Sequence, residues 1–344
     1  MRAAVLHEPN RITVEDVPDP AAGAGELVVR VRAAAICGTD MRIFRGRKTK
    51  GVRYPSVIGH EFAGEIVEVG AGVTGFKPGD AVGVDPVFPC GRCAYCLSGR
   101  ENVCANRQAL GYEFDGAFAE YIRIPKIGLD RGNVFALPPG TDFGRAALAE
   151  PTACVMNGQD NMGIHLNDTV VILGAGPIGV LHLMVAQLSG ARKVIVSEPN
   201  PKRRSEAAAL GAQVIDPRAT DLVQAVREET EGLGADAVIV AIGVPAVAEQ
   251  ALTLGRKGAR INLFAGFSVG DRPPMDVNLI HYNELIVTGA SALTRRHYKK
   301  ALGMISEGRL DVSHLITHHF ALEDFPRAME TAESGAGLKI EIGG

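Results

Sequence analysis

The pattern of apolar and polar positions changes character along the chain. Before about residue 150, short apolar runs at 27–31, 65–69 and 81–84 are separated by turn sequences such as Lys77-Pro78-Gly79-Asp80. Short runs bounded by Gly and Pro are typical of strands joined by tight turns. This part of the chain is therefore predicted to be rich in β-structure.

From about residue 165, apolar strands alternate with helical stretches. The expected strands are residues 169–173, 193–197, 213–215, 236–242, 260–264 and 284–289. Helix-forming residues lie between several of them, for example at 201–210 and 220–230. This alternation predicts a parallel sheet with helices on both faces. The tail after about 291 returns to a mixed pattern, and we expect it to rejoin the first region.

Length and composition limit the possible classes of protein. A chain of 344 residues exceeds the roughly 250–300 residues at which a single core stops growing, so we expect two domains. The net charge of −3 predicts no general attraction to nucleic acid or membranes, and no apolar run approaches the ~20 residues of a membrane helix. The first residues show no secretory signal pattern, so we expect a cytoplasmic protein. Its six cysteines should then be reduced and available for metal binding or catalysis.

A glycine-rich turn joins the first strand of the second region to a helix. Residues 170–173 lead into Gly174-Ala175-Gly176-Pro177-Ile178-Gly179, and an apolar helix is expected at 180–188. The first Gly allows a tight turn, the second lets a pyrophosphate approach the backbone, and the third allows close packing of helix and strand. Free N–H groups at the helix N-terminus would bind the phosphates. The pattern predicts a dinucleotide-binding turn.

The acid Glu198 follows the next expected strand, 19 residues after Gly179. A carboxylate at this distance accepts hydrogen bonds from the ribose hydroxyls and repels a 2′-phosphate, which favours NAD over NADP. Three basic residues follow closely: Lys202, Arg203 and Arg204. They could bind a phosphate group of the cofactor, or they could be the solvated first turn of a helix. We include Arg203 among the expected cofactor-binding residues.

Four cysteines form the most specific motif in the chain. Cys90, Cys93, Cys96 and Cys104 fall within fifteen residues. Four thiolates can close a tetrahedral zinc shell with no open position, which stabilises a loop and takes no part in chemistry. We expect a structural zinc lobe at about 88–107.

Three short segments outside this lobe supply further metal-ligand types. They are Cys37-Gly38-Thr39-Asp40, the phrase beginning Gly59-His60-Glu61, and Glu150-Pro151. A thiolate, an imidazole and a carboxylate together make a zinc site that leaves one position for substrate. Taken singly, each residue has an ordinary structural explanation, and Cys154 is expected to serve packing.

With these motifs in this order and spacing, the sequence resembles the zinc-containing medium-chain dehydrogenase/reductase family over nearly its whole length. The motifs that support this resemblance are G-H-E-x-x-G-x5-G-x-x-V from Gly59 to Val73, C-G-T-D at 37–40, the four-cysteine lobe and the glycine turn. The resemblance implies an α/β fold with a GroES-like catalytic domain (1–154), a Rossmann NAD-binding domain (155–290) and a C-terminal return to the catalytic domain (291–344). Glu150-Pro151 and the phrase Asn278-Leu-Ile-His-Tyr-Asn-Glu284 are most similar to the polyol branch of sorbitol, iditol and galactitol-phosphate dehydrogenases.

The resemblance also implies roles for single residues. Cys37, His60 and either Glu61 or Glu150 would hold a catalytic zinc, with the other glutamate nearby or reached through water. Asp40 would orient His60. Thr39 would accept the proton of the substrate hydroxyl as a hydride passes to NAD.

One position departs from the family pattern. Many members carry a histidine shortly after the catalytic cysteine, where this chain reads Asp40-Met41-Arg42. Because Arg42 cannot accept a proton at neutral pH, the proton relay must end elsewhere.

Six basic residues and no acid fall within the twelve residues 42–53. They are Arg42, Arg45, Arg47, Lys48, Lys50 and Arg53. Two interpretations stay open, a solvated loop and a site for an anionic group of the substrate.

The expected function is a zinc-dependent oxidoreductase that transfers a hydride from a secondary alcohol of a polyol or sugar to NAD. A threonine 3-dehydrogenase-like enzyme is the nearest alternative, and a zinc-free quinone reductase or cofactor-binding relative is a more distant one. The resemblance implies a homo-oligomer, a dimer or a tetramer. The expected cofactors are NAD and two zinc ions per chain.

Overall fold

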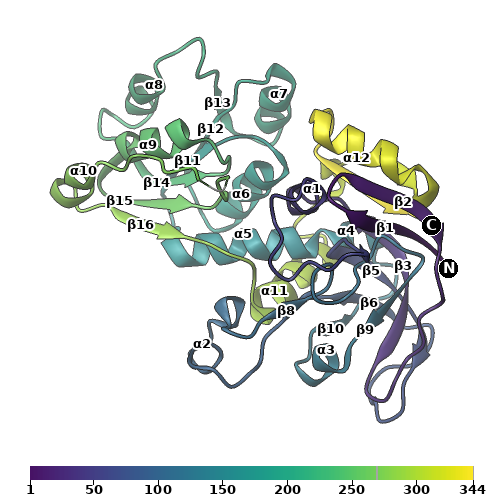
Figure 1. Cartoon of the computed structure of the whole chain (residues 1–344). Coiled ribbons are helices and arrows are strands. Elements are labelled where there is room, and N and C mark those ends of the chain that lie inside the picture. Colours follow the sequence, from purple (N-terminus) through teal and green to yellow (C-terminus); the bar gives the residue numbers. More distant parts are fainter. Residues whose placement is uncertain (269, 344) are drawn as a thin grey trace. The chain divides into compact units, whose positions relative to one another are not determined.

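The computed structural model describes residues 1–268 and 270–343 and divides into two compact units (Figure 1). Unit 1 comprises Met1–Ala153 and Ala292–Gly344, and unit 2 comprises Cys154–Ser291. Helix α5 (Ala149–Met162) carries the chain from the first unit into the second. The C-terminal segment therefore belongs to the same unit as the N-terminal one.

Unit 1 is built on a seven-stranded sheet. Its strands are β3 (Leu27–Ala35), β5 (Glu61–Val69), β6 (Ala81–Val84), β9 (Tyr121–Ile124), β10 (Val134–Ala136), β17 (Ile316–Ala321) and β18 (Lys339–Gly343). The order is β10-β6-β5-β3-β18-β17, with β9 also paired to β3. Ala35 of β3 pairs with Glu61 on one side and with Glu341 of β18 on the other, which brings the end of the chain beside its N-terminal strands.

The remaining elements of unit 1 surround this sheet. Two small sheets consist of β1 (Arg2–Glu8), β2 (Arg11–Asp16) and β4 (Ser56–Val57), and of β7 (Val87–Phe88) and β8 (Gln108–Ala109). The helices are α1 (Gly38–Phe44), α2 (Ala94–Leu97), α3 (Lys126–Asp130), α4 (Phe143–Ala147), α11 (Arg295–Ser306) and α12 (Phe325–Ser334). Short 3₁₀ turns lie at Glu101–Val103, Ser313–Leu315 and Leu322–Asp324.

The core of unit 1 draws on both ends of the chain. Phe62, Phe118 and Phe325 are almost fully buried, and the rings of Phe118 and Phe325 lie 4.7 Å apart. This packing joins helix α12 to the N-terminal sheet and so fixes the return of the C-terminal segment into unit 1.

Unit 2 contains one six-stranded sheet in which every strand pair is parallel. Its strands are β11 (Thr169–Leu173), β12 (Lys193–Ser197), β13 (Gln213–Ile215), β14 (Ala235–Val240), β15 (Gly255–Leu263) and β16 (Ile286–Gly289). The order β13-β12-β11-β14-β15-β16 is the doubly wound order of dinucleotide-binding sheets. Its helices are α6 (Pro177–Leu188), α7 (Pro201–Ala209), α8 (Leu222–Glu228), α9 (Pro245–Leu254) and α10 (Val277–Tyr282). The predicted parallel sheet is confirmed.

Burial explains why strand β11 is apolar from Val170 to Leu173. Val171 and Leu173 belong to the core on one face of the sheet, and Val170 and Ile172 to the core on the other. A strand covered on both faces has no solvent-facing positions, so its pattern is a continuous run without alternation.

Several expected boundaries in unit 2 were wrong for local reasons. The helix expected at 220–230 begins at Leu222, because Asp221 caps it by accepting from Val223 N and Gln224 N. The strand expected from 284 begins at Ile286, because Glu284 has a positive φ of 51° that ends the preceding turn. The strand expected to reach 242 ends at Val240.

A search of the described helices finds none that is both long enough and apolar enough to cross a membrane.

Candidate active site

The first metal-ligand residue, Cys37, stands at the N-cap of helix α1. Its Sγ accepts from Thr39 N at 3.5 Å, and its backbone N–H donates to Asp40 Oδ2 at 2.9 Å. This reciprocal arrangement is a capping box, with a cysteine in the place of the usual hydroxyl residue. It fixes the cysteine side chain, places Thr39 in the first helical turn and buries Asp40.

Asp40 in turn contacts the imidazole of His60. Asp40 Oδ1 lies 3.2 Å from His60 Nδ1, and both side chains are buried. Burial is the largest single influence on the pKa of His60 and lowers it, but Asp40, together with Tyr112 and Cys37, raises that pKa well above its ordinary value. Because Nδ1 faces the carboxylate, Nε2 is the ring nitrogen available to a metal, which is the usual way a carboxylate orients a ligating histidine.

Glu61 follows His60 at the start of strand β5 and is fully buried. Both of its carboxylate oxygens accept from Lys339 Nζ, which is also buried, at 2.5 Å. Burial is the largest single influence on the pKa of Lys339 and lowers it, but Glu61, together with the charges of Cys37 and Glu150, raises that pKa above its ordinary value. The charge of Glu61 is thus balanced inside the protein by a residue from the last strand.

The structure brings Cys37, His60 and Glu61 into one group. Their candidate ligand atoms all lie within 4.8 Å of one another, in the described part of the chain. Glu150 is buried at the start of helix α5 but is not a member of this group, and neither is Cys154.

The donor set of this group fits zinc. Thiolate, imidazole and carboxylate are the ligands that zinc takes in catalytic sites, and three of them leave a fourth position for substrate. His60 Nδ1 and Asp40 Oδ1, although only 3.2 Å apart, lack the alignment of a hydrogen bond and have no other hydrogen-bond partner. These two atoms face each other, so they orient the ring and leave Nε2 as the nitrogen that a metal would bind.

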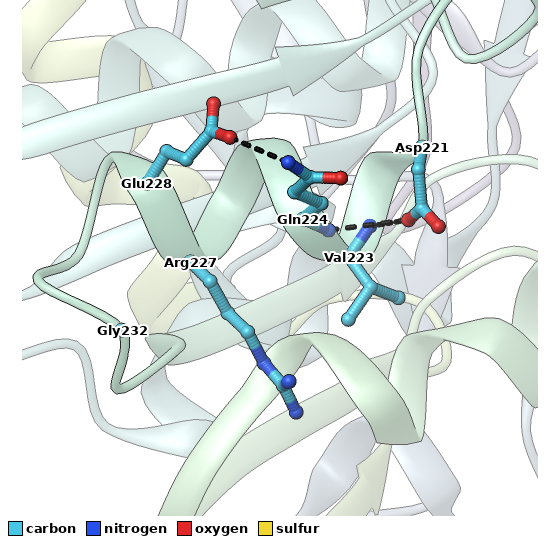
Figure 2. Close-up of a pocket in the computed structure, with 6 residues that line it drawn as sticks. All are labelled: Asp221, Val223, Gln224, Arg227, Glu228 and Gly232. Atoms are coloured by element: carbon cyan, nitrogen blue, oxygen red, sulfur yellow. Dashed lines mark hydrogen bonds between the residues drawn. The ribbon is translucent and has the colours of Figure 1, made fainter.

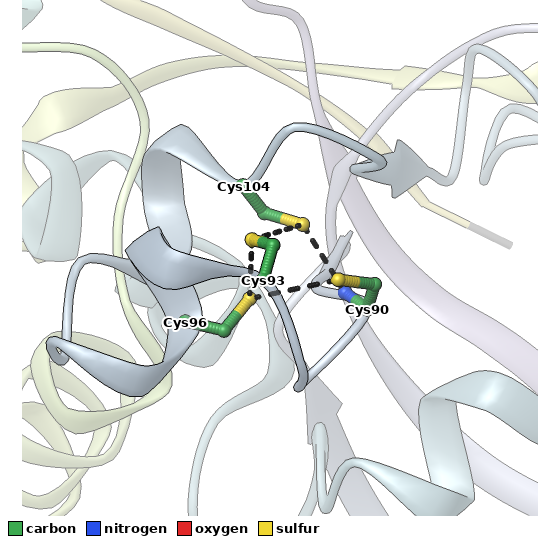
Figure 3. A group of neighbouring side chains, drawn as sticks. All are labelled: Cys90, Cys93, Cys96 and Cys104. Carbon is green, nitrogen blue, oxygen red and sulfur yellow. Dashed lines mark hydrogen bonds between the residues drawn. The ribbon is translucent and has the colours of Figure 1, made fainter.

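The four cysteines of the lobe form a second group. Sγ of Cys93 lies 3.5 Å from that of Cys96 and 3.8 Å from that of Cys104, and Cys90 Sγ lies 4.0 Å from Cys96 Sγ (Figure 3). These separations suit four sulfurs around one ion with Zn–S bonds of about 2.3 Å. Backbone hydrogen bonds from Cys96 and Ala105 lower the pKa of Cys93 to about 6, which favours the thiolate that zinc requires. Burial raises the pKa of Cys96 to about 12, so binding of the metal would have to displace the proton of that thiol.

The glycine turn of unit 2 has the geometry that a dinucleotide needs. Gly174 has a φ of 105°, and a Cβ on Gly179 would lie 1.9 Å from the carbonyl oxygen of Gly174. A Cβ on Gly176, by contrast, would meet open space. Helix α6 then begins at Pro177 without a side-chain cap. The first and third glycines are thus required by the backbone itself, while the second keeps a surface open for phosphate.

Glu198 closes this turn from the end of strand β12. Its Oε2 accepts from Ala175 N and its Oε1 from Asn200 N, both at 2.8 Å, and the residue is buried. Arg203 and Ile178, also expected at the cofactor site, are half-buried in the first turns of helices α7 and α6. The geometry fits a carboxylate that shapes the turn and keeps oxygen lone pairs for ribose hydroxyls.

A hollow of about 500 Å³ beside helix α8 has no comparable chemistry (Figure 2). Its lining residues are Asp221, Val223, Gln224, Arg227, Glu228 and Gly232. Asp221 caps the helix, and Gln224 Nε2 donates to Glu228 Oε1 at 2.9 Å along it. These polar groups serve the helix, and neither candidate metal group lines the hollow.

Two residues near the Cys37 group were missed by sequence reasoning. Lys339 is a buried lysine in a strand whose other buried residues are isoleucines, a pattern that indicates an internal charged partner. The Tyr112 ring lies 5.9 Å from the His60 ring, and burial raises the pKa of Tyr112 well above its ordinary value. No local sequence pattern distinguishes this tyrosine from one that packs elsewhere.

Comparisons with known proteins agree with this site. Residues 23–130 match the model of the alcohol dehydrogenase GroES-like domain, and residues 177–307 match that of the zinc-binding dehydrogenase. A sorbitol dehydrogenase of Halalkalibacterium halodurans is 33% identical over 97% of this chain and 96% of its own length. An L-threonine 3-dehydrogenase of Pyrococcus furiosus is 36% identical over 94% and 92%.

A solved structure extends the likeness to the whole fold. A zinc-binding dehydrogenase of Sinorhizobium meliloti bound to NADP superposes with a TM-score of 0.93 at 32% identity, covering 100% of this chain and 99% of that one. The predicted combination of a GroES-like domain with a doubly wound sheet is thereby confirmed. The chain belongs to the zinc-dependent medium-chain dehydrogenase family, as an oxidoreductase with polyol dehydrogenase-like relatives.

Proposed function

We propose that the protein oxidises a secondary alcohol of a polyol or sugar with NAD as hydride acceptor. The observation that carries this proposal is the group of Cys37, His60 and Glu61, with ligand atoms within 4.8 Å, in a chain that also carries a glycine turn closed by Glu198. Unit 1 would supply the alcohol site and unit 2 the cofactor site.

The residues of the alcohol site have distinct roles in this proposal. A zinc ion bound there lowers the pKa of a coordinated hydroxyl group. Cys37 and His60 hold the ion, and Asp40 fixes the His60 ring through the 3.2 Å contact at Nδ1. Thr39 Oγ1, in the first turn of helix α1, would accept the hydroxyl proton and at the same time pass its own hydroxyl proton on towards the ribose of the cofactor.

Glu61 would be the third zinc ligand, and Glu150 would contact the zinc ion only through a water molecule. Membership of the 4.8 Å group supports Glu61. The bonds to Lys339 do not prevent this role, because a carboxylate has about four lone-pair sites and two remain. Glu61→Gln should then weaken zinc binding more than Glu150→Gln.

The preference for NAD rests on Glu198 and on how the nearby arginines are used. Arg204 pairs with Asp216 and donates to the carbonyls of Glu198 and Pro199, and Arg218 also bonds Asp216 and Pro199. Their charges are therefore engaged within the protein, which supports a ribose with a free 2′-hydroxyl. A higher kcat/KM with NADP than with NAD would contradict the proposal.

A threonine 3-dehydrogenase-like activity is the second candidate. It is favoured by the L-threonine 3-dehydrogenase of P. furiosus, which is 36% identical. A panel of sorbitol, galactitol, their phosphates and L-threonine, followed by NADH formation, separates the two activities.

Metal content tests the zinc-dependent proposal against a zinc-free relative. Two zinc ions per chain are expected, one for each candidate group. Cys37→Ser should remove one of them and abolish turnover while NADH still binds. Cys154→Ser, a matched change outside both groups, should retain both ions and activity. Full activity in Cys37→Ser would overturn the assignment.

We also propose a homodimer or homotetramer. Strand β16 is the edge of the parallel sheet, and Ile286 on it is 54% exposed. An exposed apolar edge strand is a ready surface for pairing between chains. Sedimentation analysis of the native protein and of Ile286→Lys should show association in the first and less of it in the second.

A further inference from the structure

The basic loop that follows helix α1 is folded back on that helix. Arg47 N and Lys48 N both donate to the carbonyl oxygen of Arg42, at 2.8 Å and 3.2 Å. These two hydrogen bonds fix the backbone of the loop at Lys48, so the Lys48 side chain extends from a defined position.

The ammonium group of Lys48 lies on an aromatic ring of the alcohol site. Lys48 Nζ is 5.2 Å from the centre of the Tyr112 ring, within the range of a cation–π contact. The same ring is 5.9 Å from the ring of His60. One aromatic side chain therefore separates this cation from the proposed zinc ligand.

Charge around Lys48 is unbalanced. In the described residues no carboxylate lies within 4.0 Å of its Nζ, whereas most other half-buried cations of unit 1, such as Arg32 with Glu65, have such a partner. Burial, and then the charges of Arg107 and Arg42, lower the pKa of Lys48, and the more distant Glu113 opposes them only in part. A further anion beside Lys48 would relieve this repulsion.

We propose that Lys48 binds an anionic group of the substrate, a carboxylate or a phosphate monoester, while the hydroxyl to be oxidised lies at the Cys37 and His60 group. This inference rests on the proposed function and sharpens its substrate class. Neutral polyols would be poor substrates beside their phosphates, and a hydroxy amino acid would be held by its carboxylate. Tyr112 is the positioning residue that supports the Lys48 stem and head.

Matched pairs of substrates test the inference. The pairs are sorbitol with sorbitol 6-phosphate, galactitol with galactitol 1-phosphate, and L-threonine with L-threonine amide. In at least one pair, the native enzyme should prefer the member that carries the phosphate or carboxylate group, chiefly through a lower KM. Lys48→Met keeps the length of the side chain without its charge, and should reduce that preference about tenfold, whereas Lys48→Arg should keep most of it.

Lys50→Met is the matched control, because it removes the same charge two positions along the same loop from an exposed residue. It should leave the preference of the native enzyme in place. An equal loss on both members of a pair in Lys48→Met would show a structural role and overturn the inference. The inference would also be overturned if the native enzyme favours, in every pair, the member that lacks the phosphate or carboxylate group.

A binding measurement separates this inference from the proposed function. Inorganic phosphate is titrated calorimetrically into the zinc-loaded protein saturated with NADH, so that the cofactor site is occupied. Weaker phosphate binding in Lys48→Met than in Lys50→Met supports the anion site. This holds even if no alcohol of the panel is oxidised, because a lack of oxidation would refute only the proposed function. Equal binding in the two variants would refute the anion site.

Discussion

The carboxylate of Glu61 and the ammonium of Lys339 form a buried ion pair across 278 residues of sequence, with Nζ 2.5 Å from both oxygens. Glu61 is fully buried and Lys339 is 3% exposed. The last strand of the chain therefore supplies the counter-charge to a residue of the candidate zinc site. Completion of this site requires that the C-terminal segment has returned to unit 1.

Removal of one partner of this pair should be costly. Lys339→Met leaves the Glu61 carboxylate buried without its cation, a situation that costs about 3–5 kcal/mol of stability. Glu61→Gln leaves the lysine unpaired in the same way. Urea unfolding of the two single variants and of the double variant Lys339→Met/Glu61→Gln should give a double-variant loss well below the sum of the single losses. Additive losses, within about 0.5 kcal/mol, would mean that the two groups do not interact.

The four-cysteine lobe should bind its zinc independently of catalysis. Its short elements, helix α2 and the 3₁₀ turn Glu101–Val103, contain one buried residue, Asn102, so apolar packing contributes little to it. Cys104→Ser should remove one zinc ion and leave the other bound. Limited proteolysis should then cut within residues 90–104 in the variant and not in the native protein. Loss of both ions from Cys104→Ser would show that the two sites are linked.

Local sequence was sufficient for the elements whose cause is local. Strands β11, β12 and β13 have the expected bounds. In β11 and in the middle of β12 the cause is burial on both faces, which appears in the sequence as an unbroken apolar run. The Cys90–Cys104 lobe could be predicted for a similar reason, since four ligands at short spacing need no long-range information. The glycine turn is fixed by its own backbone, at Gly174 and Gly179.

The unpredicted parts of the site depend on contacts between distant segments. Sequence reasoning named Glu61 as a candidate ligand but could not supply Lys339, because nothing near Glu61 indicates which strand lies next to β3. It also identified the basic loop without a means of choosing among its six cations. The contact of Lys48 with the Tyr112 ring distinguishes this lysine from the other five cations, and that contact depends on tertiary packing.

Glu198 should govern both the shape of the glycine turn and the choice of cofactor. Because its two oxygens accept from Ala175 N and Asn200 N, Glu198→Ala leaves the buried N–H of Ala175 without a partner, removes the bond to Asn200 N and loosens the turn. NADH affinity, measured by nicotinamide fluorescence, should fall about tenfold, and NADPH affinity should fall less because a repelling charge is lost. Glu206→Ala, a matched change in helix α7, should alter neither affinity. An unchanged ratio of the two affinities in Glu198→Ala would contradict a role in cofactor choice.

A buried histidine in unit 2 should make stability depend on pH. His182 of helix α6 is fully buried, its ring stands edge-on to Phe264 at 4.5 Å, and burial lowers its pKa to about 3. Gln159 Nε2 donates to His182 Nδ1 at 3.2 Å and to its carbonyl oxygen at 2.9 Å, so the proton of the neutral ring is on Nε2, which has no hydrogen-bond partner. The native state thus holds this imidazole neutral.

Acidification should therefore destabilise the native state through His182. Below the unfolded pKa of about 6.5, the unfolded chain takes up a proton that the folded chain does not, so stability falls as the pH drops from about 6.5 towards 3. Between pH 7 and pH 5 this amounts to about 2 kcal/mol. His182→Leu removes the titrating group and keeps the Gln159 bond to the backbone carbonyl. Urea unfolding at pH 7, 6 and 5 should show that the free energy of unfolding falls less with decreasing pH in His182→Leu than in the native protein. His281→Leu is the control, because His281 is exposed in the same unit, and its free energy of unfolding should fall as much as that of the native protein. Parallel declines in all three proteins would mean that His182 is protonated in the folded state.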